Sequence, residues 1–286
     1  MHRTYVRAWA FAKDVQLLQF QHVSVSFESK RALEDISFQV NTGETIVVCG
    51  ATSSGKTVLL KTAIGLVYPN AGRVTLEGRN LAVDSEKEIL RLRHSVGILF
   101  QESGLFDSLT VYDNVAYPLW NPPGYGRTDD PNPEVRGRVA EALEFVGLEP
   151  MADRYPSELS GGMRRRVGIA RAIIHNPPLV LYDSPTSGLD PITAYRIMAL
   201  LIRQRDTNNT ASVVVTYRQQ DGYLLANYRH DPERGKLVRD AHPSHETRFL
   251  VLREGRLVFE GSETEMEESG DPYVTRFALR KPVMVG

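Results

Sequence analysis

The stretch GATSSGKT, residues 50 to 57, limits the fold of this chain more than any other feature. It follows an apolar, β-branched run from Thr45 to Cys49, which predicts a buried parallel strand. It precedes TVLLKTAIGLVYP, which predicts a helix that stops before Pro69. A loop of this pattern at a helix N-terminus wraps its backbone N–H groups around a polyphosphate. The loop residues expected to hold the phosphates are Gly50, Ala51, Thr52, Ser53, Ser54, Gly55, Lys56 and Thr57.

Within this loop, two side chains have the chemistry of a nucleoside-triphosphate site. Lys56 is expected to reach the β- and γ-phosphates, and the Thr57 hydroxyl is expected to ligate Mg²⁺. A second motif fits the same site: the apolar run PLVLYD ends in Asp183. A carboxylate at the end of a strand next to such a loop holds the Mg²⁺ shell. The sequence therefore predicts ATP and Mg²⁺ as ligands.

The rest of the chain alternates between strand and helix patterns. Residues 17–27 and 32–40 predict antiparallel strands, and residues 72–81 predict a hairpin with its turn at Glu77–Gly78. Strands at 178–183 and 212–216 are separated by a helix, and a last strand pair covers 249–261. An amphipathic helix at 134–146, capped by Gly147, follows a Pro- and Gly-rich loop. This alternation predicts an α/β fold with a mostly parallel sheet.

Charge and composition exclude some classes of protein. The chain has 34 basic and 35 acidic residues, a near-balance that argues against a protein built to coat nucleic acid. Its single cysteine, Cys49, allows no intrachain disulfide and is expected to be a buried, unreactive residue. We find no signal-peptide pattern and no run of ~20 apolar residues. We therefore expect an intracellular protein that reaches a membrane only through a partner.

Three further motifs complete a recognisable set. They are LSGGM from Leu159, Gln101 in ILFQESGLF, and SGLD from Ser187. Together with the phosphate loop and Asp183, this set resembles an ABC-transporter ATPase over residues 18–265. The resemblance implies a P-loop NTPase with a RecA-like, mostly parallel sheet, an antiparallel β-subdomain and an α-helical subdomain at about 102–176. It also implies a dimer, of identical or different chains, that holds two ATP molecules.

In that dimer, the resemblance gives each motif a place. The signature Ser160, Gly161, Gly162 and Met163 would face the phosphate loop of the opposite subunit. Ser187, Gly188, Leu189 and Asp190 would line the dimer interface as the D-loop. Phe27 would stack on adenine, and Gln101 would join Thr57 and Asp183 around Mg²⁺. The segment after Gln101 and the helical subdomain would form the groove for the coupling helix of a permease.

The segments LFDSLTVYDNVAYPL at 105–119, Met163 and LDPIT at 189–193 narrow the resemblance. They are similar to the MlaF/Ttg2A-like ATPases of MCE-type transporters, which move phospholipid across the bacterial envelope. This implies a peripheral protein on the cytoplasmic side of the inner membrane. Its partners would be an MlaE-type permease, an MCE protein and a STAS-domain protein. Residues 1–17 would be an extension, 228–247 a polar insertion and 266–286 a tail.

Two positions depart from the family pattern. Ser184 stands where the family has a glutamate that acts on the attacking water, and Tyr217 stands in place of the switch histidine. A serine is a poor base at neutral pH, and a tyrosine, whose ordinary pKa is about 10, does not easily carry protons there. We assign Gln101, Asp183, Ser184 and Tyr217 to the catalytic centre and expect tight ATP binding with weak turnover. Glu102 and Asp190 are the nearest substitute carboxylates in the sequence.

Two other functions stay open on the sequence alone. The chain could serve a transporter for another solute, or it could be a non-hydrolysing ATP sensor whose output is dimerisation. A soluble ABC protein acting on nucleic acid is disfavoured by the balanced charge.

Overall fold

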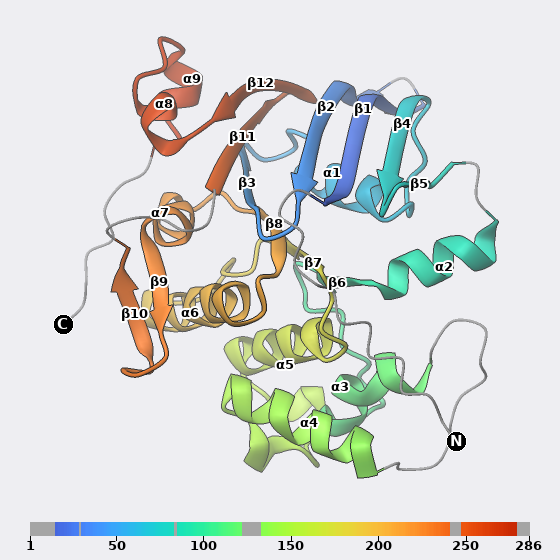
Figure 1. Cartoon of the computed structure of the whole chain (residues 1–286), viewed down its shortest axis with the longest axis vertical. Helices are drawn as coiled ribbons and strands as arrows, with labels where there is room; N and C mark the ends of the chain where they lie inside the picture. The colour runs from blue at the N-terminus through green and yellow to red at the C-terminus, as the bar shows by residue number, and fades with distance from the viewer. Residues whose placement is uncertain (1–14, 29, 83–84, 122–132, 241–246, 279–286) are drawn as a thin grey trace.

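The computed structural model describes residues 15–28, 30–82, 85–121, 133–240 and 247–278 (Figure 1). Most of the expected N-terminal extension, the loop before the 134–146 helix and the last residues of the tail lie outside this part of the chain. In the described part, no helix combines the length and the hydropathy of a bilayer-spanning segment.

A six-stranded mixed sheet forms the centre of the fold, in the order β12-β11-β3-β8-β7-β6. The β11–β12 pair is antiparallel, and the other neighbours are parallel. Every residue of β3, β7 and β8 is buried, as expected for strands covered on both faces. The strands are β3 (Thr45–Gly50), β6 (Val96–Leu99), β7 (Leu179–Asp183), β8 (Ala211–Val215), β11 (Thr247–Arg253) and β12 (Arg256–Gly261).

A second, antiparallel sheet has the order β2-β1-β4-β5. Its predicted turn is present: Glu77 and Gly78 have φ values of 49° and 74°. Two successive positive φ values give the type I′ turn that suits the twist of a two-residue hairpin. The strands are β1 (Gln16–Phe27), β2 (Lys30–Asn41), β4 (Ala71–Leu76) and β5 (Arg79–Asn80).

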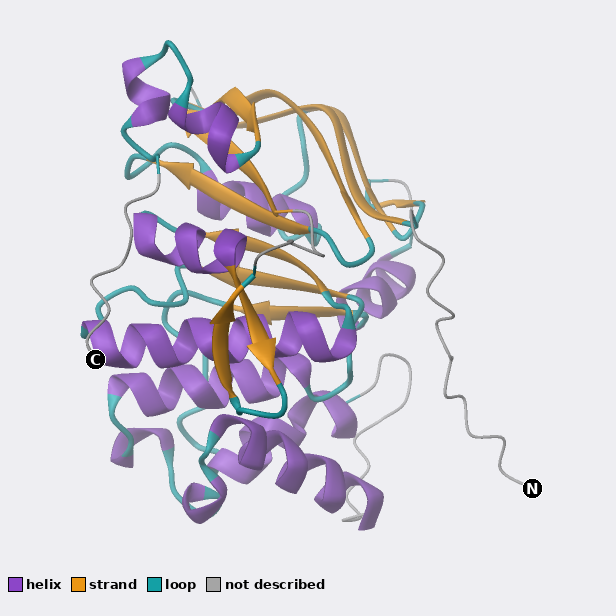
Figure 2. Cartoon of the chain, turned by 60° about the vertical axis from the view of Figure 1, so that its left-hand side comes forward, coloured by secondary structure: helices purple, strands orange, loops and turns teal. Residues whose placement is uncertain are grey.

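The helices cover the central sheet on both faces. Figure 2 shows the layers from the side, with the antiparallel sheet at the top, a helix between the sheets and a helical layer below the central strands. The helices are α1 (Lys56–Ala63), α2 (Glu86–His94), α3 (Val111–Trp120), α4 (Pro133–Val146), α5 (Gly161–Ile173), α6 (Pro191–Asn208), α7 (Gln219–Asn227), α8 (Glu263–Glu267) and α9 (Pro272–Thr275). Short 3₁₀ turns lie at Glu149–Met151 and Pro156–Glu158.

Alternation along β3 divides the core into two clusters. Val47 and Cys49 pack with the helical layer, whereas Ile46 and Val48 pack with α1 and the antiparallel sheet. Because successive strand residues point to opposite faces, one strand supplies both cores. The phosphate loop therefore begins at the end of a strand that is buried on both faces.

Helix α1 is shorter than the sequence predicted. It ends at Ala63 rather than before Pro69. Gly65 has a φ of 66°, and the N–H groups of Gly65 and Leu66 donate to the carbonyls of Thr62 and Lys61. A left-handed glycine that closes the last carbonyls in this way stops a helix.

The polar insertion contains a hairpin that the sequence did not predict. Strands β9 (Tyr228–Asp231) and β10 (Lys236–Arg239) pair antiparallel, and β9 lies against α6. Arg205 of α6 is 4% exposed and donates to the carbonyls of Leu225 and Tyr228. The hairpin is therefore fixed to the helical layer through its own backbone.

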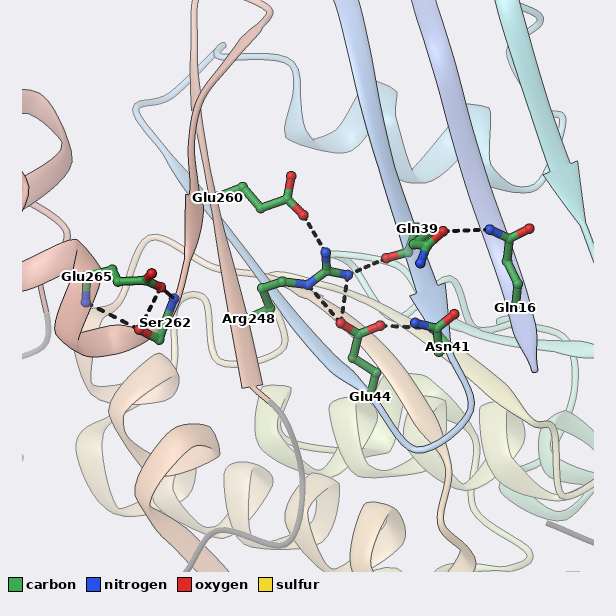
Figure 3. A network of polar contacts seen from close by, with 8 residues as sticks. All are labelled: Gln16, Gln39, Asn41, Glu44, Arg248, Glu260, Ser262 and Glu265. Carbon is green, nitrogen blue, oxygen red and sulfur yellow. Dashed lines mark hydrogen bonds and ion pairs between the residues drawn. The ribbon is translucent and has the colours of Figure 1, made fainter. Parts of the chain in front are cut away.

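Arg248 on β11 joins the two sheets (Figure 3). Its guanidinium donates to Glu44 Oε1 over 2.8 Å and to the Gln39 carbonyl over 2.5 Å, and it pairs with Glu260. Glu44 is only 6% exposed and also accepts a bond from the Asn41 N–H. A single side chain thus connects β11 and β12 with the end of β2.

Candidate functional site

The phosphate loop needs its glycines because other backbone lies against it. A Cβ on Gly50 would lie 2.5 Å from the Leu252 carbonyl, and a Cβ on Gly55 would lie 2.5 Å from the Ala32 carbonyl. Gly55 has a φ of 105° and is the residue before α1, so the helix N-terminus opens directly onto the loop. Ser53 also has a positive φ, 62°, without being glycine.

Lys56 lies along the inner side of the loop. Its Nζ donates to the carbonyls of Gly50 and Ala51, over 2.9 and 2.7 Å, and to Ser54 Oγ over 3.3 Å. Partial burial lowers the pKa of Lys56, while the neighbouring Asp183 opposes that shift. The Lys56 ammonium group is therefore held in a partly buried position, where a nearby negative charge would stabilise its charged form. Behind it, burial raises the pKa of Cys49 to about 12, as fits an unreactive thiol.

The strand-end carboxylate meets the loop. Thr57 Oγ1 donates to Asp183 Oδ2 over 3.0 Å, although the two residues come from different elements. Asp183 is 4% exposed, and Ser184 Oγ donates to its other oxygen, Oδ1, over 3.1 Å. A hydroxyl and a carboxylate are both ligands that Mg²⁺ prefers. The donor set therefore fits a magnesium ion between Thr57 and Asp183.

Ser184 is held tightly in an unusual backbone conformation. Its φ is 49°, and its N–H donates to the Val215 carbonyl over 2.9 Å. The residue is 9% exposed and lines the pocket described next. Its hydroxyl is thus fixed near the site, with its proton directed to Asp183.

A pocket of about 410 Å³ lies in front of the loop. The pocket brings together residues that are far apart in the sequence. Two of them, the basic residues Lys30 and Arg31 just after β1, were not singled out from the sequence. Phe27 is 50% exposed and Tyr217 is 57% exposed, so both rings are available to a ligand. The pocket is lined by Phe27, Lys30, Arg31, Ala32, Thr52, Ser53, Gly55, Lys56, Thr57, Val58, Gln101, Ser184, Val215 and Tyr217.

The signature residues lie elsewhere. Ser160 caps α5 by accepting a bond from the Met163 N–H over 3.2 Å, and Ser160 and Gly161 are exposed. None of Ser160 to Met163 lines the pocket. The N-terminus of α5 is consequently free to meet a different surface.

The D-loop residues connect the site to α6. Asp190 caps α6 by accepting bonds from the N–H groups of Ile192 and Thr193. A hydrogen bond from the Thr193 side chain, followed by these backbone bonds, lowers the pKa of the Asp190 carboxyl group. Tyr217 Oη donates to Ser187 Oγ over 3.5 Å. Ser187 and Gly188, like Asp190, are at least partly exposed.

A family model described as "ABC transporter" matches residues 33–187, which include the phosphate loop, the signature and Asp183. This chain belongs to the ABC transporter family. Members of this family bind ATP, usually with Mg²⁺, and their ATPases dimerise and pair with a membrane permease.

Several relatives support the same family. The methionine import ATP-binding protein MetN of Carboxydothermus hydrogenoformans is 39% identical over 207 residues, covering 71% of this chain and 60% of that protein. The probable ribonucleotide transport ATP-binding protein mkl of Mycobacterium leprae is 37% identical over 199 residues, covering 69% and 55%. This chain therefore spans only about 60% of the length of the first relative.

Solved ABC structures share the fold. The dimeric structure of the ABC transporter cassette MJ0796 has a TM-score of 0.73 and 27% identity, covering 86% of this chain and 98% of that one. A post-hydrolysis dimer of the same cassette, bound to ADP and Pi, has a TM-score of 0.69. The ABC fold predicted from the sequence is thus confirmed.

The structural role of Arg165 was not predicted from the sequence. The basic run Arg164–Arg166 has the composition typical of a solvated helix face. Arg165 is nevertheless buried, at 7% exposure. Its guanidinium donates to the Gln101 carbonyl and, over 3.2 Å, to the Phe100 carbonyl. A third bond of 3.4 Å reaches the Ser187 carbonyl. Arg165 therefore ties the segment of Gln101 to the D-loop.

Asp221 is a second residue that the sequence gave no reason to select. It is 1% exposed, and its Oδ2 accepts bonds from Thr186 Oγ1 over 2.5 Å and Thr216 Oγ1 over 2.7 Å. Burial raises the pKa of this carboxyl group, and the two threonine bonds oppose the shift. Asp221 links the turn after Ser184 to the segment of Tyr217.

Proposed function

We propose that this chain is an ATP-binding subunit of a membrane transporter that binds Mg·ATP tightly and hydrolyses it slowly. The observation that carries the proposal is the pocket in front of the phosphate loop, where Phe27, Lys56, Gln101 and Ser184 converge. Family membership supports the choice of ATP as the ligand.

The geometry of the pocket supports the following proposed roles. The N–H groups of the loop from Thr52 to Thr57 and the Lys56 ammonium would hold the phosphates, and Phe27 would stack on adenine. Thr57, Asp183 and Gln101 would hold Mg²⁺, which when bound neutralises charge on the phosphate oxygens. Gln101 is exposed at the rim of the pocket, so it is free to approach such an ion.

We propose that the site is completed by a second ATPase subunit. The N-terminus of α5 exposes Ser160 and Gly161 away from this pocket, and a helix N-terminus attracts phosphate. The dimeric MJ0796 cassette, with its shared fold, supports this arrangement. The exposed D-loop would lie in the same interface.

Slow turnover follows from Ser184 and Tyr217. The Ser184 hydroxyl donates to Asp183, so it offers water an acceptor oxygen but not a carboxylate base. Asp190, one substitute base suggested by the sequence, is already used as the cap of α6. Glu102, the other substitute base, is exposed, and the argument against Asp190 does not apply to it.

The cargo that we propose is phospholipid, moved by an MCE-type transporter from the cytoplasmic side of the inner membrane. The sequence at 105–119, Met163 and 189–193 supports this cargo and an MlaE-type permease with MCE and STAS partners. The relatives support a second candidate, import of a small solute, because two of them are described as transporting methionine and ribonucleotides. Purification of the chain with its permease from native membranes separates the two. Phospholipid extracted with the complex supports the first, and turnover stimulated by methionine or another small solute supports the second.

Calorimetric titration with Mg·ATP tests the nucleotide site. We expect Lys56→Ala to weaken binding by about 10- to 100-fold, because a charge-assisted hydrogen bond contributes about 1.5–3 kcal/mol. Lys61→Ala, on the exposed side of the same helix, is the matched control and should bind like the wild type. Equal affinity of the wild type and Lys56→Ala would contradict the proposed site.

A further inference from the structure

The segment after β12 belongs to the core of the molecule. Helices α8 and α9 (red in Figure 1) lie beside β11 and β12. Met266 and Val274 are 0% and 1% exposed, and Phe277 is 8% exposed. All three pack into the same cluster as the helical layer. Residues 271–278 are therefore a docked segment, which we call the C-terminal brace.

Tyr273 of the brace reaches the phosphate loop. Its hydroxyl accepts a bond from the Ala51 N–H over 3.1 Å and donates to the Leu252 carbonyl over 2.9 Å. The ring lies edge-on to Phe277, with centroids 5.2 Å apart, and under the Arg253 guanidinium at 5.2 Å. A hydroxyl fixed in this way holds the first peptide of the loop to the end of β11.

These contacts hold the loop from behind. The Leu252 carbonyl is the atom against which Gly50 packs, and the Gly255 N–H donates to the Ser54 carbonyl over 3.1 Å. The pocket lies on the other side, since neither Ala51 nor Tyr273 lines it. Tyr273 therefore supports the loop without occupying the place of a nucleotide.

The brace has a second attachment near the site. Gln219 Nε2 donates to the Arg276 carbonyl over 2.6 Å, and Gln219 begins α7 two residues after Tyr217. The same short segment is thus bonded to the phosphate loop at Tyr273 and to the helix after Tyr217 at Arg276. A movement of the phosphate loop or of α7 would therefore be transmitted to the other through the brace.

We propose that Tyr273 is a positioning residue for the phosphate loop, and that docking of the C-terminal brace is coupled to nucleotide binding. The coupling rests on the proposed function. A loop held in one shape loses less conformational freedom when phosphate binds, so a docked brace raises affinity. Because coupling between two binding events is reciprocal, bound nucleotide must also strengthen docking of the brace.

Titration of Tyr273→Phe with Mg·ATP tests the first half of the proposal. Phenylalanine keeps the ring and its contacts with Arg253 and Phe277 but removes both hydroxyl bonds. A net hydrogen bond contributes about 0.5–1.5 kcal/mol, so we expect affinity to fall about 3- to 10-fold. The melting temperature should change little, because the buried Val274 and Phe277 remain. Tyr68→Phe, which removes the hydroxyl of a 53% exposed tyrosine, should leave affinity unchanged.

Hydrogen exchange measured by mass spectrometry tests the brace itself. Without nucleotide, Tyr273→Phe should raise exchange in the peptide that contains Ala51 and leave β7 and β8 unchanged. Mg·ATP should protect residues 271–278 in the wild type and protect them less in Tyr273→Phe.

The outcomes separate this proposal from the proposed function. Wild-type affinity in Tyr273→Phe, or unchanged exchange at Ala51, would overturn the positioning role. A wild type that binds no nucleotide would refute the proposed function and with it the coupling. The exchange measured without nucleotide would still decide whether Tyr273 holds the loop.

Discussion

Ser184 is the residue on which the proposed slow hydrolysis depends. Its backbone has a φ of 49°, and both its N–H and its hydroxyl are engaged, with Val215 and Asp183 respectively. The position is therefore rigid and lines the pocket, which is what a group acting on water needs. What the position lacks is a carboxylate. Under the proposed function, hydrolysis would be limited by the Ser184 side chain and not by its placement.

We predict that Ser184→Glu raises ATP turnover. A positioned general base contributes about 10²- to 10⁴-fold to a rate, and the backbone conformation required is one that a non-glycine residue already adopts here. The measurement is phosphate release by the assembled transporter, compared for wild type and variant. Ser184→Gln is the control, because glutamine has nearly the shape of glutamate without its charge, and this variant should stay slow. Equal rates for Ser184→Glu and the wild type would place the base elsewhere, with Glu102 the next residue to substitute.

At the same scale, the sequence could select some residues and not others. Lys56, Thr57 and Asp183 stand in motifs whose spacing reflects phosphate and metal chemistry, so their positions could be read directly. Arg165 looked like part of a charged helix face, because the sequence does not show that the carbonyls of Phe100 and Gln101 lie against that face. Tyr273 is separated from Ala51 by most of the chain. Only the folded structure brings these pairs together.

Among the elements, the contact between α2 and the end of α5 contains an unusual pair. His94, the last residue of α2, stacks on His175 with ring centroids 5.4 Å apart. Neither ring nitrogen of His175 has a hydrogen-bond partner among the described residues. Burial, followed by the charges of His94 and Arg138, lowers the pKa of His175 to about 4. Burial also lowers the pKa of His94.

This pair predicts a loss of stability in mild acid. Because the folded pKa is lowered from 6.5 to about 4, the folded state binds fewer protons than the unfolded state between these values. The free energy of unfolding must therefore fall as the pH falls from 6.5 towards 4, by up to about 2 kcal/mol at pH 5. His175→Phe should remove most of that fall in urea unfolding at pH 7 and pH 5. Parallel losses in His175→Phe and the wild type would contradict this account.

Element types were easier to predict from the sequence than element ends. The strands with uniform apolar or alternating patterns were found, and so were the Glu77–Gly78 turn and the helix ending at Gly147. Strand β6 was missed because it is only four residues long, and the β9–β10 hairpin was missed because its sequence is mostly polar. The hairpin is held in place by contacts with α6, and its own sequence does not reveal those contacts. Helix α1 was overextended because Gly65 was read as part of an apolar helix.

For the whole molecule, the contact around Arg248 is a polar link between two sheets that also share a hydrophobic core. Glu44 is nearly inaccessible, and Arg248 is its charged partner in Figure 3. A second Arg–Glu contact joins the same two sheets at the surface. Arg256 of β12 pairs with Glu34 of β2 over 2.6 Å, but its side chain is 64% exposed. The molecule thus contains a partly buried and an exposed version of one interaction.

We predict that Arg248→Met lowers the free energy of unfolding by about 3–5 kcal/mol, since it leaves the Glu44 carboxylate buried without its partner. Arg256→Met should lower it by less than about 1 kcal/mol, because solvent screens the exposed pair. Urea unfolding of the two variants, measured side by side at pH 7, makes the comparison. Similar losses in both variants would show that burial of Glu44 is not what gives the contact its strength.

The strand order also sets when the site can form during synthesis. Among the described strands, β3, which carries the phosphate loop, pairs with β8 and β11, so Thr45 meets Ser212 on one side and Thr247 on the other. At about 5–20 residues per second, a ribosome needs roughly 10–40 s to go from β3 to β11. During that interval the loop has neither Leu252 nor Gly255 behind it. A nascent chain can therefore have most of its nucleotide motifs outside the ribosome and still be unable to hold a nucleotide in place.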